Sequence, residues 1–195
     1  NSLFVAAGDY LTIITSPDGI NWTLRNRYTS AFSSEIVDIA FGNSTFVASG
    51  YKFPPFTYDK KNIFMASSDG INWNQVNDEM PVLFNTISHG NSIFCATSWF
   101  GYITTSTDGI NWSTPIDFET TSIKSTFGNS RFVFYSFSKN YYSPDGINWS
   151  PGVTRQYFID PGAMTYGNGK FIVLDFFGIL LSSGNGSNWA YEYNG

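Results

Sequence analysis

Ser67-Ser68-Asp69-Gly70-Ile71-Asn72-Trp73 is one of five copies of the phrase that decides the fold. The phrase returns along the chain in copies that start at Ser16, Ser106, Ser143 and Ser183. The last copy is the most altered and carries Asn185 in place of the aspartate. The five Trp residues lie 51, 39, 37 and 40 residues apart, so the period is about 42 residues. A recurring period of this length indicates a repeat architecture.

A second phrase keeps the same period. It reads Phe41-Gly42-Asn43-Ser44-Thr45-Phe46-Val47 and recurs at 89–95, 127–133 and 166–172. The chain also opens inside it, at Asn1-Ser2-Leu3-Phe4-Val5. Because two independent phrases keep one register, chance resemblance is negligible.

Each period predicts four short strands, which we name a, b, c and d. In the second period they cover residues 35–41, 45–50, 62–67 and 72–77. Gly-Asn after strand a and Asp-Gly after strand c are hairpin signals, because such turns need residues that tolerate φ > 0. Four antiparallel strands in about 40 residues are typical of one blade of a β-propeller.

We therefore expect an all-β protein, a five-bladed β-propeller of four-stranded antiparallel blades in a single domain over residues 1–195. The repeat units are approximately 1–34, 35–81, 82–119, 120–158 and 159–195. Strands b, c and d occur five times but strand a only four times, so the first blade lacks its inner strand. Residues 190–195 are too short to supply it. We expect that the chain is part of a longer polypeptide, or that another chain or domain completes the open blade.

The Ser-x-Asp-Gly-x-x-Trp phrase resembles the Asp box of sialidase-type (BNR) repeat propellers. With the aromatic-Gly-Asn-x-x-Phe-Val phrase upstream, it is similar to bacterial and phage repeat propellers of that superfamily, and to photosystem II assembly-factor propellers. The gap from Ser to Trp is six residues here, one shorter than in the usual Asp box. The resemblance covers nearly the whole chain and implies the propeller fold.

We interpret the box residues as structural. An aspartate at a tight turn accepts hydrogen bonds from backbone N–H groups, the next Gly takes a left-handed conformation, and the Trp anchors strand d against its sheet. A calcium loop needs several close carboxylates, and each box has one. The structural residues are Asp18, Trp22, Asp69, Trp73, Asp108, Trp112, Asp145, Trp149, Asn185 and Trp189.

Composition excludes several classes of function. Charged residues make up 13% of the chain, its net charge is −5, and no basic stripe exists, so we expect neither nucleic-acid binding nor a polybasic membrane patch. No run of 18 apolar residues is present, so we expect no membrane insertion. Cys95 and His89 replace core and aromatic residues of the other repeats. We expect no cofactor and no metal.

An enzymatic role has little support in the sequence. Sialidases use three clustered arginines with a Tyr–Glu pair, and none of the four arginines here matches such a triad. A glycosidase would need carboxylates on the central strands. Asp38 lies inside a strand a and Asp160 near the start of another, which leaves a glycosidase as the remaining alternative. We expect no catalytic residues.

The variable b–c and d–a loops lie together on the face opposite the repeated phrases, and they are rich in aromatic residues. Such loops on a rigid scaffold commonly carry function. The d–a loops contribute Phe84 and Phe118, among others. For any one of these aromatic rings the alternative interpretation is that it packs between blades. The residues we expect to bind ligand are Tyr10, Tyr51, Tyr58, Trp99, Phe100 and Phe176.

Aromatic rings that gather on one face favour a non-enzymatic binding module. Sugars stack on such rings, so the expected ligand is a glycan, bound in a lectin-like manner with multivalent avidity. The alternative is a structural or assembly propeller whose aromatic face meets a surface protein. The insertion at 51–61 is the element that blade packing explains least. We expect an extracellular location, or one on a cell or virion surface.

Overall fold

The computed structural model describes residues 3–27, 34–53, 59–77, 80–121, 123–153 and 159–193. These residues form 19 strands and no helix. The bounds of the strands are β1 Phe4–Gly8, β2 Thr12–Ser16, β3 Thr23–Asn26, β4 Ser34–Gly42, β5 Thr45–Lys52, β6 Lys61–Ser67, β7 Asn74–Asn77, β8 Phe84–Gly90, β9 Ile93–Ser98, β10 Tyr102–Ser106, β11 Ile116–Asp117, β12 Lys124–Gly128, β13 Arg131–Tyr135, β14 Asn140–Ser143, β15 Ser150–Pro151, β16 Pro161–Gly167, β17 Lys170–Asp175, β18 Leu180–Ser183 and β19 Ala190–Tyr193.

The strands form five antiparallel sheets, and each sheet follows chain order. Four of them have four strands, β4–β7, β8–β11, β12–β15 and β16–β19, whereas β1–β3 make a three-stranded sheet. The expected propeller blades are therefore confirmed. The first blade contains strands b, c and d but no strand a among the described residues, as the repeat pattern predicts.

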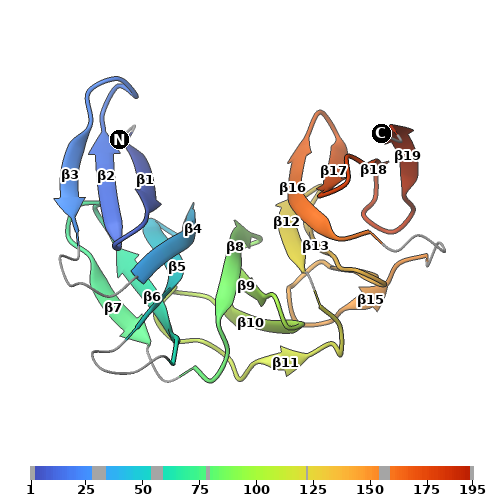
Figure 1. The fold of residues 1–195 in the computed structure, drawn as a ribbon, viewed down its shortest axis with the longest axis horizontal. Coiled ribbons are helices and arrows are strands. Elements are labelled where there is room, and N and C mark those ends of the chain that lie inside the picture. The colour runs from blue at the N-terminus through green and yellow to red at the C-terminus, as the bar shows by residue number, and fades with distance from the viewer. Residues whose placement is uncertain are drawn as a thin grey trace.

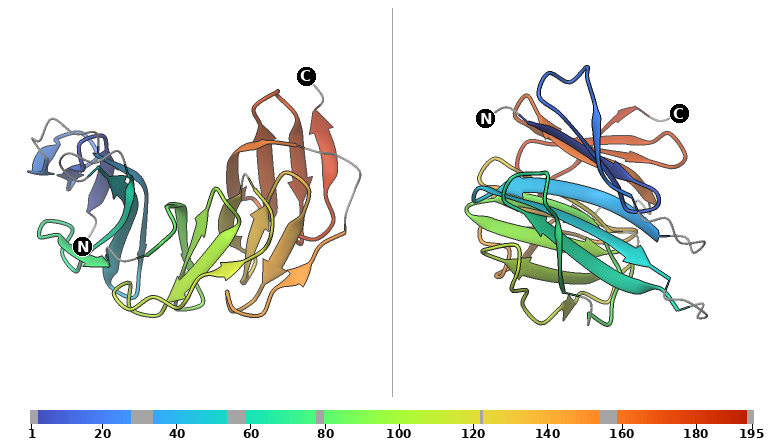
Figure 2. Two further views of the ribbon diagram at one scale, coloured as in Figure 1. Left: turned by 60° about the horizontal axis from the view of Figure 1, so that its bottom comes forward. Right: turned by 90° about the vertical axis from the view of Figure 1, so that its left-hand side faces the viewer.

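The blades follow one another around an open arc, with the sheet of β1–β3 and the sheet of β16–β19 at its two ends (Figure 1). The strands at position a, β4, β8, β12 and β16, contact one another in succession along the inside of the arc. The further views in Figure 2 show the same succession of twisted sheets. The variable loops and the repeated phrases are thus held on opposite faces of one scaffold.

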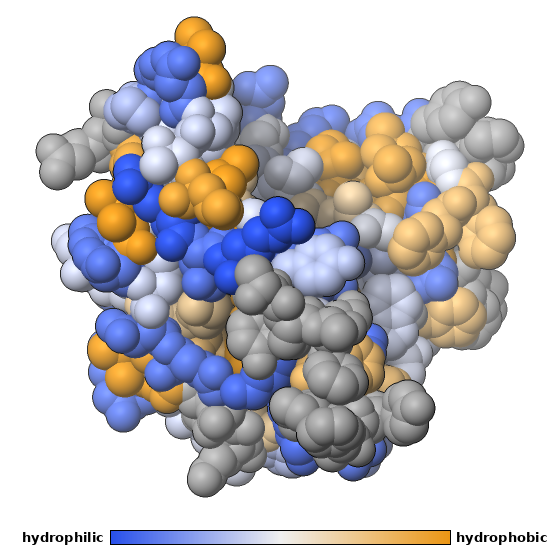
Figure 3. All heavy atoms as spheres, turned by 60° about the vertical axis from the view of Figure 1, so that its left-hand side comes forward, coloured by the Kyte–Doolittle hydropathy of each residue, from blue (hydrophilic) through white to orange (hydrophobic). Residues whose placement is uncertain are grey.

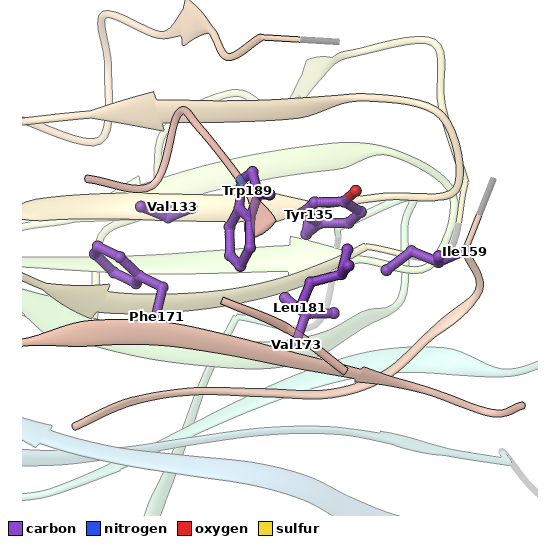
Figure 4. Packing of buried hydrophobic residues seen from close by; sticks show 7 residues of the cluster. All are labelled: Val133, Tyr135, Ile159, Phe171, Val173, Leu181 and Trp189. Carbon is purple, nitrogen blue, oxygen red and sulfur yellow. The ribbon is translucent and has the colours of Figure 1, made fainter. Parts of the chain in front are cut away.

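The hydrophobic core is divided into four clusters, one between each pair of neighbouring blades. Figure 4 shows the cluster between the last two blades, where Val133 and Tyr135 of β13 face Phe171, Val173 and Leu181 of the following sheet. Phe171, Val173 and Val133 are fully buried. Each of the three middle sheets contributes buried residues to two of these clusters, so much of the core lies between blades and not within one.

The turns between strands a and b are two-residue hairpins with an unexpected use of glycine. Asn43 and Ser44 form the loop with φ of 47° and 59°, a conformation that suits strongly twisted hairpins. Gly42 is not in the loop but pairs with Thr45 as the last residue of the strand. The Gly-Asn signal correctly predicts the position of the turn. The glycine, however, is not one of the two loop residues, as we had expected. Its actual role is to allow the next blade to approach.

Candidate functional site

The c–d turns share one hydrogen-bond pattern. Asp69 Oδ1 accepts the N–H groups of Ile71 and Asn72, both at 2.8 Å, and Asp69 Oδ2 accepts the side-chain amide of Asn72 at 2.7 Å. The Ser67 hydroxyl donates to the same carboxylate at 2.9 Å and accepts the Gly70 N–H at 2.8 Å. The same carboxylate contacts recur at Asp18, Asp108 and Asp145. This is the geometry of a turn held closed by its own carboxylate.

These hydrogen bonds change the acidity of the four aspartates. The backbone N–H of Asn72 is the largest cause that holds the pKa of Asp69 well below its ordinary value of 3.8, and the corresponding Asn residue has this role in the other three turns. In the altered fifth turn, Asn185 Oδ1 accepts the N–H groups of Ser187 and Asn188, both at 2.9 Å. A neutral amide oxygen therefore maintains the same turn.

The Trp residues of the phrase contact both their own blade and the preceding one. Trp73 packs on Phe46 and Trp149 on Phe134 of its own sheet, with ring centroids 6.3 and 5.2 Å apart, as expected. The contacts with the preceding blade were not expected. Trp112 stacks on Phe64 of the preceding blade with ring centroids 4.1 Å apart. Trp189 meets Tyr135 of the preceding blade at 4.9 Å. Trp73 and Trp149 likewise pack on clusters that include residues of the preceding blade. At the start of the arc, the ring of Trp22 is 43% exposed.

The a–b turns also join neighbouring blades, a role that the sequence interpretation missed. The Asn43 side-chain amide donates to the carbonyl oxygens of Ser92, at 2.9 Å, and Thr107, at 2.8 Å, both in the next blade. Asn91 and Asn129 repeat this bridge into the blades that follow them. The sequence did contain a signal for this role, because every copy of the second phrase has Asn at this position. On this face of the arc, the same Asn hydrogen bonds therefore recur between neighbouring blades.

The glycosidase alternative rests on Asp38 and Asp160. Asp160 Oδ1 is buried and has no hydrogen-bond partner in the described residues. Asp38 connects two blades. Its Oδ1 accepts the N–H of Ile39 and its Oδ2 accepts the N–H of Ile87 in the next blade, both at 2.8 Å. Burial raises the pKa of this carboxyl, while the two N–H groups oppose the rise. Both oxygens therefore have backbone partners, an arrangement that holds neighbouring inner strands together.

The aromatic residues expected to bind ligand are distributed over the whole arc. Tyr10, Trp99, Phe100 and Phe176 lie in b–c turns and are exposed, at 46%, 37%, 60% and 62%. Trp99 and Phe100 share one turn, whereas Tyr10 and Phe176 belong to the first and last blades. Tyr58 lies outside the described residues.

Tyr51 has structural partners of its own. Its hydroxyl donates to the Glu35 carboxylate, which is the largest cause that raises its pKa to about 12. Lys60 Nζ lies 4.0 Å from the centroid of the Tyr51 ring and 5.6 Å from that of Phe53. The ring face is therefore covered by a cation, which leaves less of it for a ligand.

Phe84 and Phe118, which we expected among the loop aromatics, are packed in the core. Phe84 is 1% exposed, and its ring centroid lies 5.6 Å from that of Phe64. Phe118 contacts the rings of Phe134 and Tyr141 at 5.1 and 5.2 Å. For these two residues the alternative interpretation, packing between blades, is correct.

Phe100 stands on a rigid turn. Its N–H donates to Ser98 Oγ at 3.1 Å, and the following Gly101 has φ of 91°. A Cβ at Gly101 would lie 2.4 Å from the carbonyl oxygen of Thr120, so only glycine lets the two backbones meet. The Gly101 carbonyl accepts the N–H of Phe118 at 3.0 Å. These contacts fix the backbone on both sides of the exposed ring.

Two adjoining cavities share the Phe100 ring. The first has a volume of about 620 Å³ and a mainly apolar wall that contains Pro81, Val82, Leu83, Phe100, Tyr102, Thr114 and Pro115. The second, of about 360 Å³, contains Phe100, Asp117, Glu119, Thr120, Thr121, Phe137 and Ser138. We call this combined surface the Phe100 surface. It lies on the b–c/d–a face, where the sequence predicted binding, but only Phe100 among its residues was predicted.

The acidic half of this surface is also organised by hydrogen bonds. Asp117 Oδ1 accepts the N–H of Glu119 at 2.8 Å, and Glu119 has φ of 49°, unusual for a residue with a side chain. The Tyr102 hydroxyl bonds to Asp117, which raises the pKa of that tyrosine. The Tyr102 side chain therefore connects the apolar wall to the carboxylates.

Within the described ranges, no three His, Cys, Asp or Glu residues gather as metal ligands would. The same ranges contain no helix of the length and apolarity needed to cross a membrane. Cys95 is buried and free, and burial raises the pKa of its thiol to about 12.

No protein-family model and no curated protein matches this chain. Solved structures do match it. One is from the crystal structure of a nidogen/laminin complex, with a TM-score of 0.69 and 10% identity, covering 99% of this chain and 79% of the other. Another is YCF48 from Cyanidioschyzon merolae, with a TM-score of 0.61 and 17% identity, covering 85% of this chain and 58% of the other. Both neighbours are β-propellers, so the likeness supports the fold.

Proposed function

We propose that this propeller is a protein-binding module and that the Phe100 surface takes a short peptide segment of its partner. The observation that carries the proposal is the Phe100 ring, which is 60% exposed on a rigid turn and shared by an apolar and an acidic cavity. Exposed rings beside pockets are typical anchors of interfaces.

The two cavities define the chemistry of that segment. Pro81, Val82, Leu83 and Pro115 offer an apolar wall that suits an aliphatic or aromatic side chain. Asp117 and Glu119 in the adjoining cavity suit a lysine or arginine one or two residues away. The net charge of −5 favours encounter with a basic partner. The nidogen structure was solved in a complex with laminin, which supports a protein partner for this fold without identifying one here.

A glycan is the second candidate, favoured by one observation. Phe100 and Phe137 line the same cavity as the hydroxyl side chains of Thr120, Thr121 and Ser138. A sugar could stack on the rings and hydrogen-bond to the hydroxyls and carboxylates. The other aromatic b–c turns would then give several weak sites around the arc, with avidity.

Three further points belong to this proposal. We propose that the module is not an enzyme; the backbone N–H groups that engage both oxygens of Asp38 support this. Its repeats are kin to the BNR/Asp-box superfamily, supported by the recurring Ser–Asp turn. We propose that it acts outside the cell or on a cell or virion surface.

Selection from a random peptide library, run beside a glycan array, tests the proposal. We expect enriched peptides that combine an apolar and a basic residue, and loss of their binding in Phe100→Ala. Ile147→Ala is the matched control, since Ile147 is similarly exposed, at 57%, but lies in a c–d turn on the other face. Glycan binding that depends on Phe100 would select the second candidate. If neither library gives binding that depends on Phe100, the proposal is wrong.

A further inference from the structure

The hairpin between β5 and β6 extends further than the b–c hairpins of the other blades in the described residues. β5 and β6 pair at seven positions, from Phe46 with Ser67 to Lys52 with Lys61. The b–c hairpins of the other blades pair at four or five positions. Because the first pair has the same place in each blade, the additional pairs lie at the tip of the hairpin, on the b–c/d–a face.

Two lysines are directly opposite each other at this tip. Lys52 of β5 pairs with Lys61 of β6, and residues in such a pair project from the same face of the sheet with Cβ atoms about 5 Å apart. The next residues on that face are Gly50 and Ile63, and the residue opposite Lys52 on β4 is Ser34. None of these three neighbours carries a charge. We call Lys52 and Lys61 the lysine pair.

No carboxylate of the described residues compensates the charge of the lysine pair. The one ion pair within those residues joins Lys170 to Glu192 in the last blade. Lys52 Nζ instead donates to the neutral side chain of Gln75, with 2.9 Å between Nζ and Oε1. Lys61 is exposed. The two ammonium groups are therefore available to an anionic group of another molecule.

The opposite face of the hairpin has a different chemistry. Tyr51 adjoins Lys52 in β5, so its ring projects from that other face. There its hydroxyl donates to Glu35, and Lys60 Nζ lies 4.0 Å from the centroid of its ring. Lys60 Nζ also lies 5.6 Å from the centroid of the Phe53 ring. The two rings are thus covered by Lys60, on the face away from the lysine pair.

The lysine pair lowers the stability of the hairpin, because like charges directly opposite each other in a sheet are destabilising. Lysines on an edge strand can prevent pairing with other chains, but β5 lies between β4 and β6. The net charge of the chain is −5, so a local pair of positive charges is also opposite in sign to the whole. On the side of the molecule formed by the first two blades, hydrophilic residues lie between apolar patches (Figure 3). A feature that costs stability at an exposed tip is typical of a binding site.

We propose that the lysine pair binds an acidic segment of a protein partner. A carboxylate that lies between the two ammonium groups attracts both and offsets their mutual repulsion. A sulfated glycan carries the same charge, but the Tyr51 and Phe53 rings lie away from the lysine pair, so a sugar bound there has no ring of this hairpin to stack on.

This inference goes beyond the proposed function, because the Phe100 surface suits apolar and basic side chains and the lysine pair suits acidic ones. Both sites lie on the b–c/d–a face. A partner that carries segments of opposite charge would therefore be held on this face in one orientation.

Fluorescein-labelled hexaglutamate is the probe, titrated with the full chain at low salt and followed by fluorescence anisotropy. We expect saturable binding that weakens as salt is added, because salt screens exposed charges. Lys61→Gln should weaken binding about threefold, which is the effect of losing one exposed ion pair. Lys139→Gln is the matched control, since Lys139 lies in the b–c turn of the fourth blade, on the same face, and its substitution should leave binding unchanged.

Lys61→Glu separates binding from stability. It should abolish hexaglutamate binding and raise the melting temperature, because a glutamate opposite Lys52 replaces repulsion by attraction. A lower melting temperature would show that a carboxylate of the chain itself occupies the lysine pair, which overturns the proposal.

The proposal is also overturned if Lys61→Gln binds hexaglutamate as the parent does, or if a sulfated hexasaccharide binds through Lys61 while hexaglutamate does not. Phe100→Ala should bind hexaglutamate with the parent affinity. Its loss of binding would assign the acidic segment to the Phe100 surface and overturn the proposal. A negative result with hexaglutamate leaves the peptide selection at the Phe100 surface unaffected, so the two proposals fail separately.

Discussion

Gly42 lies directly against the imidazole ring of His89 in the next blade: a Cβ built on this glycine would be 2.1 Å from His89 Cγ. Gly90 meets Phe127 and Gly128 meets Tyr166 in the same way. The glycine of the second phrase and the aromatic residue of the following copy are therefore two halves of one contact. His89 occupies the aromatic position of this contact, in agreement with the sequence, where it replaces the aromatic residue of the other repeats.

We expect Gly42→Ala to destabilise the protein by about 1–3 kcal/mol, because the added methyl group overlaps a ring that is held between two blades. Gly167→Ala is the matched control. Gly167 has the same place in the last blade, but nothing lies within 4 Å of its Cβ position. Its substitution should change stability by less than about 0.5 kcal/mol. Urea denaturation of both variants measures the difference, and equal losses would contradict the contact.

His89→Phe should make stability less dependent on pH. Burial lowers the pKa of His89 from its ordinary 6.5, and its Nε2 is buried with no hydrogen-bond partner in the described residues. As the pH falls through 6.5, the unfolded chain takes up the proton first, so stability is lost in the parent and kept in the variant. Thermal melts from pH 8 to pH 5 should diverge towards low pH. Parallel curves would show that His89 is readily protonated in the fold.

Asp108→Ala should destabilise the protein by about 1–2 kcal/mol, because the N–H groups of Ile110 and Asn111 lose their acceptor. Asp108→Asn should lose less, since an amide oxygen already has this role at Asn185. Chemical denaturation of the two variants provides the comparison. If the asparagine variant is as unstable as the alanine variant, the carboxylate has a role beyond the turn.

Acid should unfold the protein partly through the four turn aspartates. Their pKa values lie below the ordinary 3.8 in the folded chain. From about pH 5 downwards the unfolded chain therefore binds protons that the folded turns exclude, and stability falls with pH. A variant with asparagine at all four positions should show a shallower fall in melting temperature between pH 5 and pH 2. An unchanged slope would assign acid sensitivity to other groups.

The strands could be predicted from the sequence because the two repeated phrases mark their turns. Strand a of the second blade was predicted at 35–41 and is found at Ser34–Gly42. The direction in which an aromatic ring points was harder to predict. Phe84 and Phe100 both belong to the variable face, yet one is buried against Phe64 and the other is exposed. Which of the two rings packs into the core depends on the neighbouring blade. The sequence around each ring contains no information about that neighbour.

The walls of the candidate site were missed for a related reason. Pro81, Val82 and Leu83 come from the d–a loop before β8 and Pro115 from the residue before β11, so they are far apart in the sequence and converge only in the folded chain. The inter-blade role of Asn43 was missed because a Gly-Asn pair already has a local explanation as a turn. Repetition showed that these residues matter, but the partner of each lies one period away in the chain.

We propose that the two faces of the arc have different roles: the repeated phrases hold the blades together, and the Phe100 surface recognises the partner. The most direct test is one titration of the parent, Phe100→Ala and Asp108→Ala with the best peptide from the selection, each with its melting curve. Phe100→Ala should bind at least tenfold more weakly at an unchanged melting temperature. Asp108→Ala should melt earlier and bind with the parent affinity. If Asp108→Ala loses affinity without loss of stability while Phe100→Ala binds normally, the division is contradicted.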